Sequence, residues 1–340
     1  MKSLVLEADR VLRFKEHDFP EVPGWARIRV AFAGICGSDL GRAFRGGAYH
    51  YPLVMGHEFS GIVLRPGSGN RVRREDRVAV YPLLPCGRCP ACREGNPQLC
   101  SDYGYFGSRR DGGFTGELSV PEENLVPVPP NVSLEEAALC EPAAVAHHAV
   151  ARLGVRPGNR AAVWGAGPVG LLAAQWLRIF GCSEVALIDI DAGKLQLAES
   201  LGFATGLPAD PPDCCVEACG IAETRTQALA AAGRQGKILF IGNAEGDWTV
   251  TAKQFSGMLR RELTLFGSWN STIAEDWTAV LARCAAGELR LAPLISGIEP
   301  LSRGGEMFEA IAAGRKRGCK FLLRPAPPDS AGQSSTLQGE

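Results

Sequence analysis

The sequence predicts an α/β protein in which a β-rich domain is joined to a doubly wound parallel sheet. Its 340 residues are enough for two domains. Residues 1 to about 130 contain short alternating strands separated by Gly and Pro, whereas apolar strands alternate with helices from about residue 160. A glycine-rich turn also stands between a strand and a helix in the second half, as expected of a doubly wound sheet.

In the first half, alternation of apolar and polar residues predicts strands at 26–30, 77–80 and 117–120. Short strands with Gly/Pro-rich breaks between them indicate a barrel-like unit. A connector at 127–131 is followed by Ser133 and Glu136, which have the spacing of a capping box and predict the start of a helix.

In the second half, apolar runs of strand length alternate with longer stretches of helical pattern. The predicted strands are 161–164, 185–188, 237–241 and 263–266, and the predicted helices are 169–180, 194–201 and 222–232. A helical stretch beyond Pro300 leads to a last strand at 319–323. The tail at 326–340 is rich in Pro, Ser, Gly and Gln, so we expect it to be disordered.

The charge of the chain is balanced, with 36 Lys and Arg against 37 Asp and Glu. A net charge of −1 argues against a nucleic-acid or anionic-membrane binder, because those need a concentrated basic face. The N-terminus has no secretion signal, and the longest uncharged stretch, 161–177, contains Gly and Pro breaks. We therefore expect a cytoplasmic protein with a small-molecule partner, and neither nucleic acid nor membrane.

Four of the 12 cysteines, Cys86, Cys89, Cys92 and Cys100, fall within fifteen residues. Four thiolates at this spacing close a tetrahedral shell around Zn²⁺ and leave no position for a substrate. The sequence therefore predicts a structural zinc site here, with an iron–sulfur cluster as the chemical alternative.

The glycine-rich turn contains Gly165, Gly167 and Gly170, with Pro168 and Val169 between them. It follows a predicted strand and opens a predicted helix, whose free N–H groups can bind a pyrophosphate. Asp189 ends the next strand, where a carboxylate accepts hydrogen bonds from a ribose diol and repels a 2′-phosphate. We therefore expect NAD rather than NADP, the alternative being a tight turn with no ligand.

A third group of candidate residues is dispersed along the chain, namely Cys36, His57 and Glu141. A thiolate, an imidazole and a carboxylate can hold Zn²⁺ with an open fourth position for an alcohol oxygen. Pro142 disfavours helical geometry at Glu141, so a break there is expected to direct the carboxylate away from the preceding helix. Spacing alone leaves open a lone buried cysteine and a capping carboxylate.

These motifs together resemble the zinc-dependent medium-chain dehydrogenase/reductase family. The resemblance covers about residues 1–325 and rests on the Gly56-His57-Glu58 motif, the four cysteines and the glycine fingerprint, in that order. It implies a GroES-like β-rich catalytic domain and a Rossmann domain with the active site in the cleft between them. The implied division is 1–148 catalytic, 149–287 Rossmann and 288–325 a return segment that completes the catalytic domain.

The resemblance also implies roles for individual residues. Cys36, His57 and Glu141 would hold a catalytic zinc, with Cys140 as a rival ligand, which makes two zinc ions per chain. Glu58 would be a nearby carboxylate that approaches the metal when a ligand leaves. Ser38 would relay the alcohol proton and Asp39 would orient His57. A homo-oligomer is implied, with the strand at 263–266 in the interface.

Within this family, further stretches resemble dehydrogenases of polyol phosphates. They are Cys36–Leu40, Tyr51-Pro52, Pro82–Cys86, Gly107–Phe114, Arg261–Thr264 and Gly267–Trp269. The expected reaction is oxidation of a secondary alcohol of a polyol phosphate, with an unphosphorylated polyol such as sorbitol or xylitol as the alternative. A non-catalytic nucleotide-binding protein is a third possibility, but it has no use for an open zinc site.

A phosphate on the substrate requires local cations, since the net charge provides no general attraction. Arg109 and Arg110 lie in a glycine-rich loop and are the candidate phosphate clamp, the alternative being a solvated pair with Asp111.

Three stretches depart from the family pattern. Residues 203–213 are too few for the usual crossover helix, which affects the edge strand and one helical layer. The role of His50 and Tyr51 is open. Cys214, Cys215 and Cys219 are expected to pack on a buried strand rather than to bind a ligand.

Overall fold

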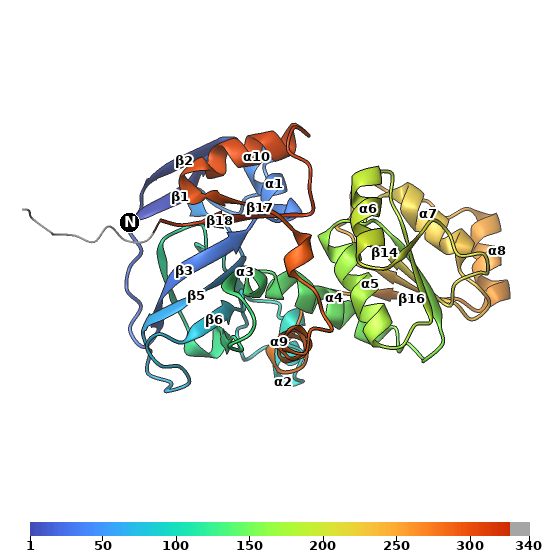
Figure 1. The fold of residues 1–340 in the computed structure, drawn as a ribbon, viewed down its shortest axis with the longest axis horizontal. Coiled ribbons are helices and arrows are strands. Elements are labelled where there is room, and N and C mark those ends of the chain that lie inside the picture. The colour runs from blue at the N-terminus through green and yellow to red at the C-terminus, as the bar shows by residue number, and fades with distance from the viewer. Residues whose placement is uncertain (327–340) are drawn as a thin grey trace, which may run out of the picture.

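The computed structural model describes residues 1–326 and shows two lobes side by side. Of the tail at 326–340 that is predicted to be disordered, residues 327–340 lie outside the described residues. In Figure 1 the first lobe contains the blue and cyan N-terminal strands together with the red C-terminal elements, and the second lobe is green to orange. The chain therefore leaves the first lobe once and returns to it. Within residues 1–326, no helix is both long enough and apolar enough to cross a membrane.

The first lobe is built mainly from strands, as the alternating pattern predicts. Its strands are β1 (Lys2–Ala8), β2 (Val11–Glu16), β3 (Ala26–Gly34), β4 (Leu53–Val54), β5 (Glu58–Arg65), β6 (Arg77–Val80), β7 (Leu83–Leu84), β8 (Gly104–Tyr105), β9 (Glu117–Val120), β10 (Leu125–Pro127), β17 (Ile295–Pro300) and β18 (Lys320–Arg324). Its helices are α1 (Gly37–Phe44), α2 (Pro90–Arg93), α3 (Leu134–Ala137) and α10 (Gly304–Ala312).

The main sheet of this lobe has the order β10-β6-β5-β3-β18-β17, with β9 also paired to β3. The last strand, β18, pairs antiparallel with β3, so that Leu322 lies opposite Gly34. The C-terminal segment thus completes the sheet begun by the N-terminal half, in line with the expected return segment. The proposed limits of the domains remain predictions.

The second lobe holds a six-stranded parallel sheet of order β13-β12-β11-β14-β15-β16. Its strands are β11 (Arg160–Trp164), β12 (Glu184–Ile188), β13 (Ala204–Thr205), β14 (Cys214–Glu217), β15 (Lys237–Phe240) and β16 (Thr264–Gly267). Its helices are α5 (Pro168–Ile179), α6 (Ala192–Ser200), α7 (Ala222–Ala231) and α8 (Ala252–Arg261). The strand order reverses next to β11, and ligands of doubly wound sheets bind at that switch point.

The central strands of this sheet are apolar on both faces. In β11, Val163 packs in the core on the α5 side, where Leu171 and Trp176 lie, whereas Trp164 packs with Leu229 of α7 on the other face. Strands covered by helices on both faces give continuous apolar runs rather than alternation. This explains why the sequence predicts these strands well.

The predicted gap in the helical layer is real. No helix joins β13 to β14, and the chain crosses between them as a linker at 206–213. The edge strand β13 consists of two exposed residues, Ala204 and Thr205. The short segment therefore reduces the edge of the sheet and leaves the fingerprint turn intact.

Helix α4 (Cys140–Arg152) joins the lobes and corrects one expectation. The chain does break after the helix begun at Ser133, but the break falls at 138–139 and α4 starts at Cys140. Glu141 is therefore helical, and Pro142 stands in the first turn of α4, where a missing N–H costs nothing.

Candidate active site

A cleft of about 660 Å³ lies between the lobes and brings together predicted site residues from both of them. The residues that line it from the first lobe include Cys36, Ser38, His57, Glu58 and Glu141. From the second lobe, Gly167, Pro168, Val169 and Gly170 line it. The candidate metal ligands and the glycine fingerprint, far apart in sequence, thus face one space.

Cys36 and His57 are brought together by the start of α1 and the start of β5. Cys36 is the residue before α1, and its N–H donates to the Asp39 carboxylate at 3.1 Å. Asp39 is fully buried, and its Oδ1 lies 3.3 Å from Nδ1 of His57. This position agrees with the expected orienting role of Asp39, since it leaves Nε2 of His57 to bind a metal.

Ser38 and Asp39 share a cation that the sequence analysis did not identify. Arg42 donates from Nη1 to Oγ of Ser38 at 3.0 Å and to Oδ1 of Asp39 at 3.1 Å. Burial alone would raise the pKa of Asp39, but His57 and Arg42 lower it, so the carboxylate is ionised. The spacing on helix 37–44 could have revealed this, because Arg42 follows Asp39 by three residues and Ser38 by four.

Glu58 is paired with a buried lysine from the last strand. Nζ of Lys320 donates to the two Glu58 oxygens at 2.8 and 2.7 Å, and both residues are almost fully buried. Gly34, opposite Glu58 in the sheet, makes room for the carboxylate, since a Cβ there would lie 2.3 Å from Oε2. Lys320 was not predicted as a site residue either, although a charged residue in an otherwise apolar predicted strand indicates a buried ion pair.

Glu141 lies in the same cleft and is held by Tyr105, whose hydroxyl donates to Oε1 at 3.0 Å. Burial raises the pKa of the Glu141 carboxyl. The group whose ligand atoms lie within 4.8 Å of one another is Cys36, His57 and Glu58. The structure therefore places Glu58, rather than the predicted Glu141, closest to the thiol and the imidazole, because β5 carries Glu58 next to His57.

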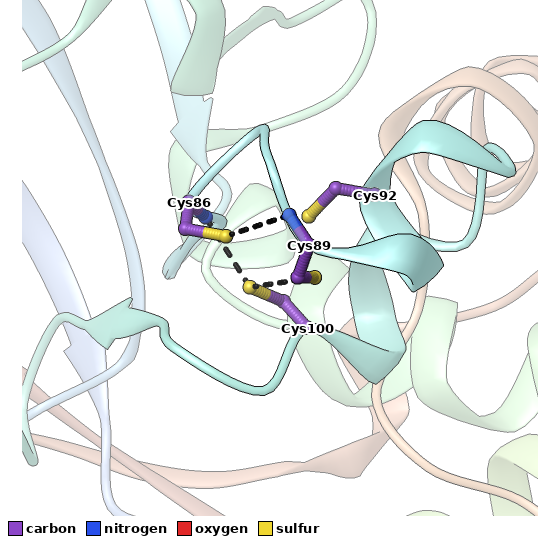
Figure 2. A group of neighbouring side chains, drawn as sticks. All are labelled: Cys86, Cys89, Cys92 and Cys100. Atoms are coloured by element: carbon purple, nitrogen blue, oxygen red, sulfur yellow. Dashed lines mark hydrogen bonds between the residues drawn. The ribbon is translucent and has the colours of Figure 1, made fainter.

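The predicted structural metal site is assembled as expected. Ligand atoms of Cys86, Cys89, Cys92 and Cys100 lie within 4.8 Å of one another, and Figure 2 shows their sulfurs pointing into a common space. Backbone N–H groups donate to two of the sulfurs, from Cys86 to Cys100 at 3.2 Å and from Cys89 to Cys86 at 3.4 Å.

These N–H···S bonds favour thiolates, the form that binds metals. Hydrogen bonds from the backbone of Cys92 and Ser101 lower the pKa of Cys89 to about 6. Both groups of side chains therefore fit zinc. The four cysteines form a closed structural site, and Cys36 and His57 with a cleft glutamate form an open one.

The fingerprint turn has the geometry of a phosphate-binding loop. Gly165 has φ +100°, and a Cβ on Gly170 would lie 1.8 Å from the Gly165 oxygen, so neither position accepts a side chain. Gly167 caps α5, with Pro168 at its first position, and nothing lies within 4 Å of a Cβ built on Gly167. The N-terminus of α5 is therefore open to an anion.

Asp189 follows directly after β12, as predicted. Its Oδ2 accepts from the N–H of Ala166 at 2.8 Å and its Oδ1 from that of Asp191 at 2.9 Å. Nζ of Lys194 lies 3.7 Å from Oδ2. These contacts fix the carboxylate beside the fingerprint, with lone pairs left for a diol.

The predicted phosphate clamp is not part of the cleft lining. Neither Arg109 nor Arg110 is among the residues that line it, and Asp111 accepts from Val54 and lies near His17 rather than pairing with either arginine. The guanidinium of Arg109 lies between two tyrosine rings instead. The arginines that do line the cleft are Arg42 and Arg45.

The expectation for Cys219 is wrong, whereas Cys214 and Cys215 are buried on β14 as predicted. Cys219 is exposed and lines the cleft. The strand ends at Glu217, whose Oε1 accepts the N–H groups of Cys219 and Gly220 at 2.8 and 2.7 Å. These bonds turn the chain out of the sheet before Cys219.

Comparison with known proteins agrees with this geometry. Residues 22–130 match the family described as "Alcohol dehydrogenase GroES-like domain", and residues 168–286 match "Zinc-binding dehydrogenase". The chain belongs to the zinc-dependent medium-chain dehydrogenase/reductase family, which confirms the prediction from the motifs.

Among individual relatives, the chain is similar to galactitol 1-phosphate 5-dehydrogenase of Escherichia coli (strain K12). The two are 34% identical, covering 96% of this chain and 100% of the relative. The crystal structure of galactitol-1-phosphate dehydrogenase from Escherichia coli superposes with a TM-score of 0.89 at 33% identity, covering 96% of this chain and 100% of that chain. D-xylulose reductase A of Aspergillus niger is 30% identical, covering 94% of this chain and 96% of the relative. The protein is thus an oxidoreductase of the zinc alcohol and polyol dehydrogenase type.

Proposed function

We propose that the protein oxidises a secondary alcohol of a polyol phosphate and transfers the hydride to NAD, converting galactitol 1-phosphate to the ketose phosphate tagatose 6-phosphate. The observation that carries the proposal is the cleft of about 660 Å³, which is lined by the candidate zinc ligands on one side and the fingerprint on the other. Such a cleft can bring an alcohol carbon next to a nicotinamide ring.

Cys36, His57 and Glu141 would hold the catalytic zinc, and Cys86, Cys89, Cys92 and Cys100 the structural zinc. Glu58 stays beside the catalytic set with its charge offset by Lys320. When bound, the catalytic zinc supplies a Lewis acid for the substrate hydroxyl and the nicotinamide ring supplies the hydride acceptor.

In this proposal, Ser38 moves the alcohol proton. Its Oγ accepts from Arg42 at 3.0 Å, which fixes one lone pair and leaves the second to accept the substrate proton. Its own hydroxyl proton then passes outward along the cleft. Asp39 keeps His57 in one orientation throughout, since its carboxylate is also held by Arg42 and by the N–H of Cys36.

The phosphate of the substrate is assigned to Arg45. Its side chain is exposed in the cleft lining, and Nη1 lies 2.9 Å from the Glu245 carboxylate of the second lobe. An exposed ion pair of this kind contributes little, so a phosphate can replace Glu245 as the partner of the guanidinium.

The alternative substrate is an unphosphorylated polyol, which the similarity to D-xylulose reductase A favours. Formation of NADH, followed by absorbance, with galactitol 1-phosphate, galactitol, sorbitol and xylitol in parallel distinguishes the two. The proposal expects the highest kcat/KM with galactitol 1-phosphate. A preference for a neutral polyol would establish the alternative, and no turnover of any of the four would refute both.

NAD is proposed as the cofactor on the strength of Asp189, whose carboxylate lies beside the fingerprint and would repel a 2′-phosphate. A homo-oligomer is proposed on the strength of β16, a sheet edge with exposed side chains.

A further inference from the structure

Three side chains form a stack at the mouth of the cleft. Cζ of Arg109 lies 4.5 Å from the ring centroid of Tyr49 and 4.4 Å from that of Tyr103. Both tyrosines line the cleft, whereas Arg109, between them, is not among the lining residues. Tyr49 is 61% exposed and marks the rim. We call this group the Tyr49–Arg109–Tyr103 stack.

The stack rests on a rigid turn. The N–H groups of Ser108, Arg109 and Arg110 all point at the Tyr105 carbonyl, at 3.2, 3.0 and 3.1 Å. Gly107 and Gly112 lie against the backbone of Gly56. A Cβ on Gly107 would lie 2.6 Å from the carbonyl carbon of Gly56, and a Cβ on Gly112 would lie 2.2 Å from its carbonyl oxygen. Since Gly56 precedes His57, the turn that carries Arg109 is fixed relative to the candidate metal ligands.

The stack continues inward to the site. The rings of Tyr103 and Tyr105 meet edge to face with centroids 6.3 Å apart, and the Tyr105 hydroxyl donates to Glu141. Tyr103 itself lies in the short segment between Cys100 and β8. One wall of the cleft therefore runs from the solvent-exposed rim to a proposed zinc ligand.

The charge of Arg109 is not neutralised by an acid. In the described part of the chain, no carboxylate lies within 4.0 Å of its guanidinium nitrogens. Two aromatic faces hold the planar cation instead, by cation–π attraction. In return, the guanidinium keeps the two rings at a fixed separation.

We propose that the Tyr49–Arg109–Tyr103 stack is the specificity-determining wall for the end of the polyol remote from the reacting carbon. Tyrosine rings pack against the C–H face of a polyol, and their hydroxyls exchange hydrogen bonds with its hydroxyl groups. Arg109 is a positioning residue, which acts through the two tyrosines. The inference rests on the proposed function, because it requires a polyol in the cleft.

The test compares Arg109→Ala with Arg110→Ala, an exposed neighbour outside the stack, using the zinc-loaded enzyme with NAD. The substrates are 2-propanol, which is too short to reach the rim, galactitol and galactitol 1-phosphate. We expect Arg109→Ala to raise KM about tenfold for both hexitols, with little change in kcat and none in KM for 2-propanol. Arg110→Ala should change none of these values, and Arg109→Lys, which keeps the charge but not the planar group between the rings, should restore only part of the affinity.

Four outcomes would overturn the inference. An equal rise in KM for all three substrates would indicate a general structural role, and no rise would remove the stack from substrate binding. A rise confined to galactitol 1-phosphate would make Arg109 a direct phosphate ligand. If the wild-type enzyme oxidises 2-propanol but neither hexitol, the proposed substrate class is wrong. The assignment of the Tyr49–Arg109–Tyr103 stack to polyol recognition is then wrong as well.

Discussion

Two buried carboxylates face the cleft, but only one has a cation for a partner. Lys320 donates to both oxygens of Glu58, whereas the contact of Glu141 is the neutral hydroxyl of Tyr105. A buried carboxylate without a compensating charge is unfavourable. Binding of Zn²⁺ by Glu141 would remove that cost, although Glu58 lies nearer to Cys36 and His57.

The zinc content of variants therefore distinguishes which of the two glutamates, Glu141 or Glu58, is the zinc ligand. We expect Glu141→Gln to lose one of two zinc ions per chain, measured by elemental analysis of the purified protein, because the open site loses a charged ligand. The double variant Glu58→Gln/Lys320→Met removes the buried pair together, so no unpaired charge remains. It should keep both ions. Loss of one ion from the double variant, with both retained in Glu141→Gln, would make Glu58 the ligand.

The proposed preference for NAD over NADP rests on Asp189, whose carboxylate lies beside the fingerprint. Removing its carboxylate deletes the acceptor for a ribose diol and the repulsion of a 2′-phosphate. We expect Asp189→Ser to lower the preference for NADH over NADPH about tenfold or more, measured as the ratio of the two Kd values by titration. Glu184→Ser, an exposed position at the other end of β12, is the control. An unchanged ratio in Asp189→Ser would place the selectivity elsewhere.

At the scale of elements, helix α4 is tied to the π-helical turn η3 (Ile273–Trp277) by a buried carboxylate between two histidines. Oδ1 of Asp276 lies 2.6 Å from Nδ1 of His147, and Oδ2 lies 3.1 Å from Nδ1 of His148. The N–H of Thr272 donates to the same carboxylate at 2.6 Å. Because α4 begins with the turn that carries Glu141, this junction connects the segment that follows β16 to the site.

The contacts of Asp276 with His147 and His148 predict that the fold loses stability at low pH. Burial would raise the pKa of Asp276, but hydrogen bonds from His147 and His148 lower it overall. A lowered carboxyl pKa stabilises the fold above the unfolded pKa of about 4 and loses that contribution as pH falls further. We expect Asp276→Asn to lower the free energy of unfolding by about 2–3 kcal/mol at neutral pH.

Thermal unfolding from neutral pH down to below pH about 4 measures this difference. The difference in Tm between wild type and Asp276→Asn should become smaller at the acidic end of this pH range. Glu275→Gln, an exposed neighbour, should follow the wild type throughout. A gap that stays constant with pH would show that the ionised carboxylate is not the cause.

Elements and contacts differ in how far the sequence predicts them. Strand β11, helix α5 and the four-cysteine loop are defined by local patterns, and the structure places them within a residue or two of the expected positions. The pair of Lys320 with Glu58 joins residues 262 positions apart, so only the folded sheet brings them together. Cys219 was misplaced for a local reason, because the side chain of Glu217 ends the strand early.

At the scale of the whole molecule, the two edges of the parallel sheet differ. One edge is β13, only two residues long, and short edges resist pairing with another chain. The other edge is β16, which is four residues long, pairs within residues 1–326 with β15 alone and carries the exposed Leu265. An edge of this kind can pair with a second copy of itself about a two-fold axis.

We therefore expect a dimer that joins two sheets through β16, consistent with the proposed homo-oligomer. Leu265→Asp should shift the protein to monomer in light scattering coupled to size exclusion, because like charges would face each other across the two-fold axis. Leu207→Asp changes a more exposed leucine near the opposite edge and should leave the dimer intact. A wild-type monomer, or dissociation by Leu207→Asp alone, would exclude β16 as the interface. Retention of zinc in monomeric Leu265→Asp would further show that each chain builds its own cleft, as the lining residues require.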